Sequence, residues 1–313
     1  MATLTSAAAD RLRRGARART SVGSERRLPF GRQLLLHAFL LMVTATVLFP
    51  IAWILSMSLD PRGLSRPQDL TLIPPGATLD AFAQVIEQPT ANPVSLPVLM
   101  FNSFKLAIGS AAVSLALGVL AAYAFSRLRF RFRQTLMIVI LGVLMLPAIA
   151  TIAPLFVQLN RITLGDFNLR NSLFGVGLAI VSGALPFAIW NLKGYLDTIP
   201  RELEEAATID GATRNQVFVR IILPLATPAL AVTGFLGFVA GYTEYYFSWT
   251  FLRNPEDFTL AMALASMVGQ FARTTPWSEF AAFALLFAAP VSIVFLLLQR
   301  YIVSGLAIGG VKG

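Results

Sequence analysis

The chain has 313 residues, of which 56% are hydrophobic and 13% are charged. Because about a quarter of the residues in a soluble domain are charged, this composition excludes an ordinary soluble protein and indicates an integral membrane protein. The absence of cysteine and the single histidine exclude disulfides, thiolate metal sites and histidine clusters, so we expect neither a metal site nor an ordinary membrane enzyme.

The net charge of +9 would suggest a nucleic-acid partner for a soluble protein. In a membrane protein the basic inner loops explain the same sign, so we expect the lipid bilayer, and not nucleic acid, as the partner. The phosphate-binding pattern G-x-x-x-x-G-K-[ST] is absent from the sequence. If ATP drives this protein, the nucleotide is therefore bound by another polypeptide.

Residues 1–32 contain eight arginines and no apolar periodicity, which predicts a cytosolic basic tail. Six apolar stretches follow, and each is long enough to cross the roughly 30 Å hydrocarbon core as a helix. They cover about residues 33–59, 103–125, 134–159, 171–192, 221–251 and 280–303. We therefore expect an all-α integral membrane protein with six transmembrane helices within residues 33–303.

Lysine and arginine decide the orientation, because the cytosolic side of a membrane protein carries the excess of them. In this arrangement 18 of the 25 basic residues fall on the side of the two termini, which are therefore expected in the cytosol. Residues 60–102 are expected outside as a long loop with little regular structure. Pro147 and Pro154 should bend the third span, and Pro224 and Pro228 should break the fifth near its inner end.

Glu244 interrupts the fifth span. An acid at membrane depth is a candidate functional residue, because a charge facing lipid is costly. Tyr242, Tyr245 and Trp249 surround this acid, however, and such aromatic residues gather at membrane interfaces. Glu244 is therefore either a functional membrane acid or a residue near the outer headgroups or a partner subunit.

Residues 193–220 form a long polar segment with helical patterning between two apolar runs. Thr198 can cap a helix whose first turn is rich in glutamate, and Gly211 supplies the left-handed residue that commonly ends a helix. Thr213 followed by Gln216 is a capping box for a second helix. We expect a short helix, a bend and another helix on the cytosolic side.

The spacing of Glu205-Ala206-Ala207, Asp210-Gly211-Ala212, Leu223-Pro224 and Pro228 resembles the EAA loop of ABC-importer permeases. The sequence GLAIGGVKG at residues 305–313 is similar to the end of the second permease subunit of maltose-type importers. The resemblance runs from about residue 34 to residue 313. It implies a permease that moves maltose, maltodextrin or a related oligosaccharide across the bacterial inner membrane by alternating access.

The same resemblance implies a heteromeric complex. Its other members would be a second permease subunit, two ATP-binding cassette ATPase subunits and an extracytoplasmic sugar-binding protein. ATP and magnesium would be bound by the ATPase, so this chain is expected to hold no cofactor and to catalyse no reaction.

In this family a coupling helix docks in a cleft of the ATPase subunit. Glu205 would accept a charged hydrogen bond there, whereas Glu204, one position round the helix, is expected to matter less. The implied ATPase contacts are Leu203, Glu205, Ala206, Ala207, Asp210, Gly211 and Ala212. Residues 304–313 are expected to form a cytosolic tail. The resemblance implies that its small and flexible end reaches between the ATPase subunits through Gly309, Gly310, Val311, Lys312 and Gly313. An outer loop is implied to contact the binding protein through Gly269, Gln270, Phe271, Ala272, Arg273, Thr274, Thr275, Pro276 and Trp277.

Other functions fit parts of the sequence. A related importer could carry a solute other than a sugar. A self-contained secondary transporter or channel would use Glu244 as its ion-coupling acid. An intramembrane hydrolase would need a base for a nucleophilic serine, and His37 has no matching partner motif. Co-purification with an ATPase subunit would separate the importers from the other two classes.

Overall fold

The computed structural model describes residues 29–64, 72–268 and 275–309, and the chain divides into two compact units, residues 1–52 and 53–313. In the first unit the described residues form helix α2 (Phe30–Ser58), whose last residues belong to the second unit. This helix has a mean hydropathy of 2.3 over its most apolar window, which fits a membrane-spanning segment.

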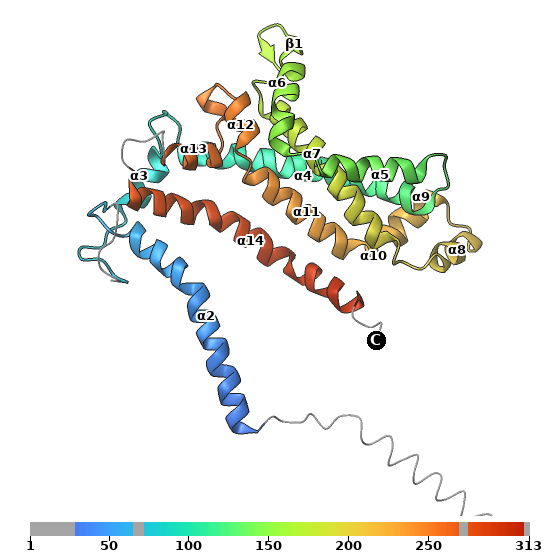
Figure 1. The fold of residues 1–313 in the computed structure, drawn as a ribbon, viewed down its shortest axis with the longest axis horizontal. Coiled ribbons are helices and arrows are strands. Elements are labelled where there is room, and N and C mark those ends of the chain that lie inside the picture. Colours follow the sequence, from blue (N-terminus) through green and yellow to red (C-terminus); the bar gives the residue numbers. More distant parts are fainter. Residues whose placement is uncertain (1–28, 65–71, 269–274, 310–313) are drawn as a thin grey trace, which may run out of the picture. The chain divides into compact units, whose positions relative to one another are not determined.

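The second unit is built around helix α4 (Leu96–Arg127), which packs against α7 (Leu173–Leu196) and α11 (Thr227–Tyr242). Helix α14 (Trp277–Gly309) packs on α11, as Figure 1 shows. The shorter described helices are α3 (Asp80–Glu87), α5 (Arg133–Leu144), η1 (Ala148–Thr151), α6 (Ile152–Asn160), α8 (Glu202–Ile209), α9 (Arg214–Val217), η2 (Phe218–Ile222), α10 (Leu223–Leu225), α12 (Tyr246–Phe251), η3 (Pro255–Asp257) and α13 (Leu260–Ser266).

Glycines bring the backbones of the long helices together. A Cβ at Gly241 of α11 would lie 2.8 Å from the Cα of Ala107 in α4, and one at Gly118 of α4 would lie 2.9 Å from the Cβ of Ala188 in α7. Larger residues cannot occupy these positions without moving a helix. Small residues at helix interfaces are the usual means of close packing between membrane helices.

Two pairs of helices are bent where a span was expected. The axes of α5 and η1–α6 differ by 100° across a break that ends at Pro147, whereas Pro154 lies in the first turn of α6 and does not interrupt it. Proline is tolerated in a first turn because its missing N–H has no intrahelical acceptor there. A second bend of 74° lies at Ala226, between Pro224 and Pro228 as predicted.

Length and composition therefore give four to six candidate spans among the described residues. Four helices are long and apolar enough to cross a membrane, and the number becomes six if each bent pair is one span. The fold is that of an all-helical membrane protein. Its described strands are the two-residue β1 (Thr163–Leu164) and β2 (Phe167–Asn168), which pair antiparallel around Gly165, a residue with φ +59°.

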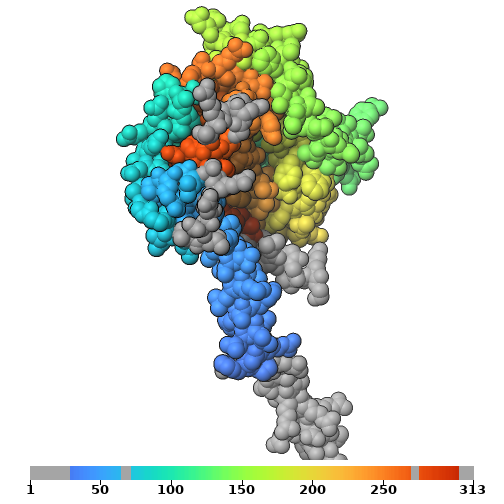
Figure 2. Space-filling view, turned by 60° about the vertical axis from the view of Figure 1, so that its left-hand side comes forward, coloured from blue at the N-terminus to red at the C-terminus, as the bar shows by residue number. Residues whose placement is uncertain are grey.

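The segment at residues 60–102 contains more regular structure than we expected. Helix α3 and the first turns of α4 lie within it, and Val85 of α3 is fully buried in a cluster with Leu260 and Phe283. Burial of this apolar face stabilises a helix that is too short to persist alone. Figure 2 shows the teal residues of this region beside the orange and red residues of α13 and α14.

Candidate functional site

The polar segment after α7 forms α8, a tight turn and α9. In Figure 1 α8 lies at one end of the second unit and α3 lies at the opposite end. Gly211 has φ +88°, as predicted, and two backbone hydrogen bonds close the helix: Ala212 N–H donates to the Ala207 carbonyl at 2.9 Å, and Gly211 N–H donates to the Thr208 carbonyl at 3.1 Å. This pair of bonds is a Schellman motif, which requires the left-handed residue.

The start of α9 carries the predicted capping box. Gln216 N–H donates to the Thr213 hydroxyl oxygen, and the Thr213 backbone N–H donates to the Gln216 side chain at 2.7 Å. The predicted cap at the start of α8 is wrong. The Thr198 hydroxyl donates instead to the Tyr195 carbonyl at 2.7 Å, because Thr198 closes the end of α7, and Arg201 is the residue that precedes α8.

The residues expected to contact an ATPase divide between two environments. Leu203 is 45% exposed, and its exposed neighbours are Glu205, Ala206, Asp210 and Gly211. Ala207 and Ala212 are half-buried and pack against an apolar cluster that includes Val217, Ile222 and Leu192. Leu203, Ala206 and Ala207, three of the apolar residues among the expected contacts, therefore do not share one outward face. Ile209, which sequence reasoning left out, is 86% exposed and extends that face.

Glu204 is the residue whose role the sequence does not reveal. Its carboxylate pairs with the Nε of Arg127, the last residue of α4, and accepts a hydrogen bond from the Tyr123 hydroxyl at 3.3 Å. The side chains of Arg127 and Glu204 are only 7% and 15% exposed. Glu204 is thus bound within the chain, whereas Glu205 is exposed. That Glu204 matters less than Glu205 at the ATPase contact stays a prediction.

A second set of polar contacts lies beside this ion pair. Ser126 donates to the Asp197 carboxylate at 2.6 Å, and Lys193 donates to its other oxygen at 2.5 Å. Burial opposes ionisation of Asp197, but the hydrogen bonds from Lys193 and Ser126 outweigh it and lower the pKa of this carboxyl. Asp197 therefore stays ionised at neutral pH and holds the end of α7 against the end of α4.

One sequence signal for the ion pair exists, although it is weak. Glu204 and Ala207 are three residues apart and share the inner face of α8, and Arg127 is the basic residue in the last turn of α4. Periodicity can therefore suggest that Glu204 faces inward. It does not reveal the partner, which lies 77 residues away along the chain.

Glu244 has partners within its own segment. Its carboxylate accepts hydrogen bonds from Phe247 N–H at 2.6 Å, Ser248 N–H at 2.9 Å and the Ser248 hydroxyl at 2.5 Å. The two backbone donors are among the N–H groups in the first turn of α12, which have no acceptor within the helix. Hydrogen bonds to the start of a helix account for an acid within this apolar run, so neither ion coupling nor a position in the headgroups is needed to explain it.

The two remaining predicted contact regions are described only in part. Gly269 to Thr274 and Gly310 to Gly313 lie outside the described residues. Trp277 is the first residue of α14, and Thr275 and Pro276 are half-buried before it. Gly309 is the last residue of the same helix, so α14 extends further into the predicted flexible tail than we expected.

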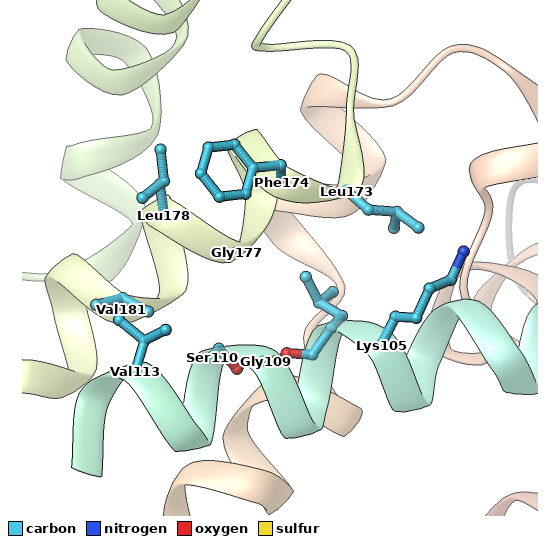
Figure 3. Close-up of a pocket in the computed structure, with 10 residues that line it drawn as sticks. Lys105, Gly109, Ser110, Val113, Leu173, Phe174, Gly177, Leu178 and Val181 are labelled. Carbon is cyan, nitrogen blue, oxygen red and sulfur yellow. Dashed lines mark hydrogen bonds between the residues drawn. The ribbon is translucent and has the colours of Figure 1, made fainter. Parts of the chain in front are cut away.

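A groove of about 300 Å³ lies between α4 and α7. In Figure 3 Val113 of α4 faces Val181 of α7, and the Lys105 amine and Leu173 lie at the other end. The lining is apolar apart from Lys105 and Ser110, whose hydroxyl donates to the Leu106 carbonyl at 2.7 Å. Such a lining offers few of the polar groups that orient a sugar.

In the described part of the chain no cluster of acidic or histidine side chains could hold a metal ion.

Comparison with known proteins relates these features to a family. The family described as "Binding-protein-dependent transport system inner membrane component" matches residues 114–308, which is more than half of the chain. The maltose/maltodextrin transport system permease protein MalG of Escherichia coli (strain K12) is 36% identical over 293 residues, covering 90% of this chain and 96% of that protein. The galactooligosaccharides transport system permease protein GanQ of Bacillus subtilis (strain 168) is 33% identical over 284 residues, with the same two coverages.

A solved structure has the same fold. A chain in the crystal structure of a bacterial ABC transporter involved in the import of the acidic polysaccharide alginate has a TM-score of 0.69 and 23% identity, covering 88% of this chain and 98% of that chain. A permease component is not an enzyme, because ATP hydrolysis resides in a separate subunit, and no cofactor is expected on it. The resemblance that the EAA-like spacing suggested is confirmed: the chain belongs to the binding-protein-dependent transport system inner membrane components, the multi-pass permeases of bacterial ABC importers.

Proposed function

We propose that this chain is one of two permease subunits of a sugar importer, and that it moves maltose, maltodextrin or a related oligosaccharide. The observation that carries the sugar assignment is the similarity over 90% of the chain to permeases for maltodextrins and for galactooligosaccharides. The complex would contain a second permease subunit, two ATPase subunits and an extracytoplasmic sugar-binding protein. Closure of the ATPase pair would drive alternating access.

The exposed side of α8 supports ATPase docking. Leu203, Ala206 and Ile209 give it an apolar surface with small and large side chains, and Glu205 provides one charge for a donor on the ATPase. The Schellman turn fixes the direction in which α8 leaves the membrane domain. A short rigid helix with both features suits insertion into a groove.

The proposed orientation places α8 in the cytosol. Both termini would lie on the same side, since 18 of the 25 lysine and arginine residues then fall there. The hairpin β1–β2, helix α3 and residues 269–277 would face outward, where the last of these segments would meet the binding protein. The apolar groove between α4 and α7 supports a division of labour in which the second permease subunit supplies most of the sugar contacts.

The test is reconstitution of the whole transporter. The chain would be expressed with its second permease and ATPase subunits, placed in vesicles and supplied with its binding protein outside and ATP inside. We expect uptake of labelled maltodextrin or galactooligosaccharide that depends on ATP, and none of a labelled amino acid. Uptake by this chain alone without ATP would contradict the importer, and ATP-dependent uptake of a solute other than a sugar would contradict only the substrate.

A further inference from the structure

The inner end of α4 is hydrogen-bonded to the first part of the segment that carries α8. Arg127 pairs with Glu204 on α8 through Nε and donates a further hydrogen bond from Nη2 to the Ile199 carbonyl at 2.9 Å. Arg201 donates back to the Ser126 carbonyl at 3.1 Å. A movement of α8 is therefore passed directly to the end of α4. It does not have to pass through α7, which precedes α8 in the chain, or α11, which follows it.

The opposite end of α4 is bonded to the segment between α12 and α13. Asn102, which is 2% exposed, donates to the Glu256 carbonyl at 2.6 Å and to the Phe258 carbonyl at 3.0 Å. The fully buried Ser103 hydroxyl accepts from the Leu260 N–H at 2.8 Å. Buried hydrogen bonds of this kind fix both the position and the rotation of a helix end, because a lost partner leaves a desolvated polar group.

Between these two ends α4 has the properties of a rigid rod. It is an unbroken helix of 32 residues, about 48 Å long, and the described residues place no proline in its interior beyond the first turn. Its contacts with α7 and α11 resist small adjustments, because a Cβ at Gly118 or Gly241 would lie within 3 Å of an atom of the neighbouring helix. A rod held at both ends transmits a displacement from one end to the other.

We infer that α4 is a lever that passes the movement of the coupling segment to the outer face, and that the Arg127–Glu204 ion pair is the joint that drives it. This inference rests on the proposed function. Arg127 and Glu204 are positioning residues, since they act through α4 and need touch neither sugar nor nucleotide. The ion pair is suited to a joint because the planar guanidinium holds a carboxylate in a defined orientation, whereas an apolar contact can slide.

The experiment uses the reconstituted complete transporter and measures sugar molecules imported per ATP hydrolysed. Arg127→Gln and Glu204→Gln each remove one charge of the joint, and the double exchange Arg127→Glu with Glu204→Arg restores an opposite pair. We expect each single variant to keep its ATPase subunits and to lose roughly tenfold in the import ratio, the scale on which coupled residues interact. The double exchange should recover most of that loss. Matched controls are Glu202→Gln and Arg129→Gln, both exposed residues beside the joint.

A purely structural ion pair would lower uptake and hydrolysis in proportion, so an unchanged import ratio in the single variants would overturn the inference. So would a double exchange that is no better than the weaker single variant, or loss of the ATPase subunits from the single variants. Thermal unfolding of each purified permease separates loss of stability from loss of the joint. If the single variants unfold, the import ratio of the double-exchange variant still decides the test. Wild-type transporter without nucleotide-driven sugar uptake would instead overturn the proposed function, and the inference with it.

Discussion

At the scale of single residues, two neighbouring glutamates have opposite tasks. Glu204 faces inward and is neutralised by Arg127, so its negative charge serves the chain itself. Glu205 is exposed on the next position of α8 and is available to a partner. Because consecutive residues of a helix point about 100° apart, a single turn can be anchored on one side and present a charge on the other.

Glu205→Ala tests the outward charge. If Glu205 pairs with a donor on the ATPase, its removal leaves that donor buried and unpaired, and the affinity should fall by about thirtyfold or more. The measurement is retention of the ATPase by the immobilised permease at matched abundance. Glu202→Ala is the control, because Glu202 is an exposed acid in the same helical turn. Equal retention in both variants would remove Glu205 from the docking contact.

Gly211 offers a second test at this scale. Its φ of +88° is strained for any residue with a Cβ, yet no atom lies within 4 Å of where a Cβ would stand. Only the backbone therefore resists substitution, at about 1–2 kcal/mol. Gly211→Val should misdirect α8 and lower both uptake and ATPase retention, whereas Gly211→Asn should be milder, since asparagine tolerates the left-handed region. Equal activity of the two variants would show that the turn does not set the angle of α8.

Local chemistry could be predicted from the sequence where it depends on neighbouring residues. The left-handed glycine and the Thr213–Gln216 capping box follow from patterns a few residues long. Contacts between distant residues could not be predicted in this way. The Arg127–Glu204 pair requires the end of one helix to meet the start of another, and no spacing in a single sequence states that. The cap by Glu244 was missed because α12 is a short helix inside an apolar run whose start gives no signal.

At the scale of elements, α4 and α11 approach each other closely at one glycine, Gly241. A Cβ at Gly241 would meet the Ser110 hydroxyl at 2.5 Å and the Ala107 Cα at 2.8 Å. The Cα is a backbone atom, so it cannot relieve the clash by changing a side-chain rotamer. Gly234 lies on the same helix, where a Cβ would meet only the flexible end of Leu115 at 3.5 Å. Two glycines two turns apart therefore differ sharply in how much space surrounds them.

Gly241→Ala should consequently be far more harmful than Gly234→Ala. Overpacking of a tight core costs about 1–3 kcal/mol, whereas Gly234→Ala should be neutral or slightly stabilising because alanine favours the helix. Thermal unfolding of the two purified variants in detergent measures the difference. A lower midpoint for Gly234→Ala than for Gly241→Ala would contradict the observed packing of α4 against α11.

The apolar runs locate the long helices well, because hydropathy is set by composition alone. Breaks within those runs are harder to predict. Pro147 and the pair Pro224 and Pro228 do mark bends, but Pro154 does not, since its effect depends on where α6 begins. Helices α3 and α13 lie in segments that were expected outside the bilayer, and each forms because its apolar face packs in one cluster with α4 and α14. That burial belongs to the tertiary structure and leaves little trace in composition.

At the scale of the whole molecule, the number of membrane crossings is set by the two bent pairs. If α5 and η1–α6 cross together, residues before and after them lie on opposite sides; if they form a re-entrant loop, both lie on the same side. The second pair, which runs from α9 to α12, poses the same alternative. Bends of 100° and 74° are compatible with either arrangement, and the side on which the coupling segment lies depends on the first pair, because that pair precedes α8 in the chain.

Single cysteines decide between these arrangements, and the natural sequence is a ready background because it contains none. We expect Asp166→Cys and Glu256→Cys to react with an impermeant maleimide applied outside intact cells, and Gln134→Cys and Asn215→Cys to react only after the membrane is opened. All four side chains are exposed, so access and not burial decides labelling. Each pair of positions brackets one bent helix pair. Labelling of Gln134→Cys and Asp166→Cys from the same side would make α5–α6 a re-entrant loop and, with the N-terminus in the cytosol, would remove α8 from the compartment that holds ATP. If Asn215→Cys and Glu256→Cys were also labelled from one side, the number of crossings would fall to four.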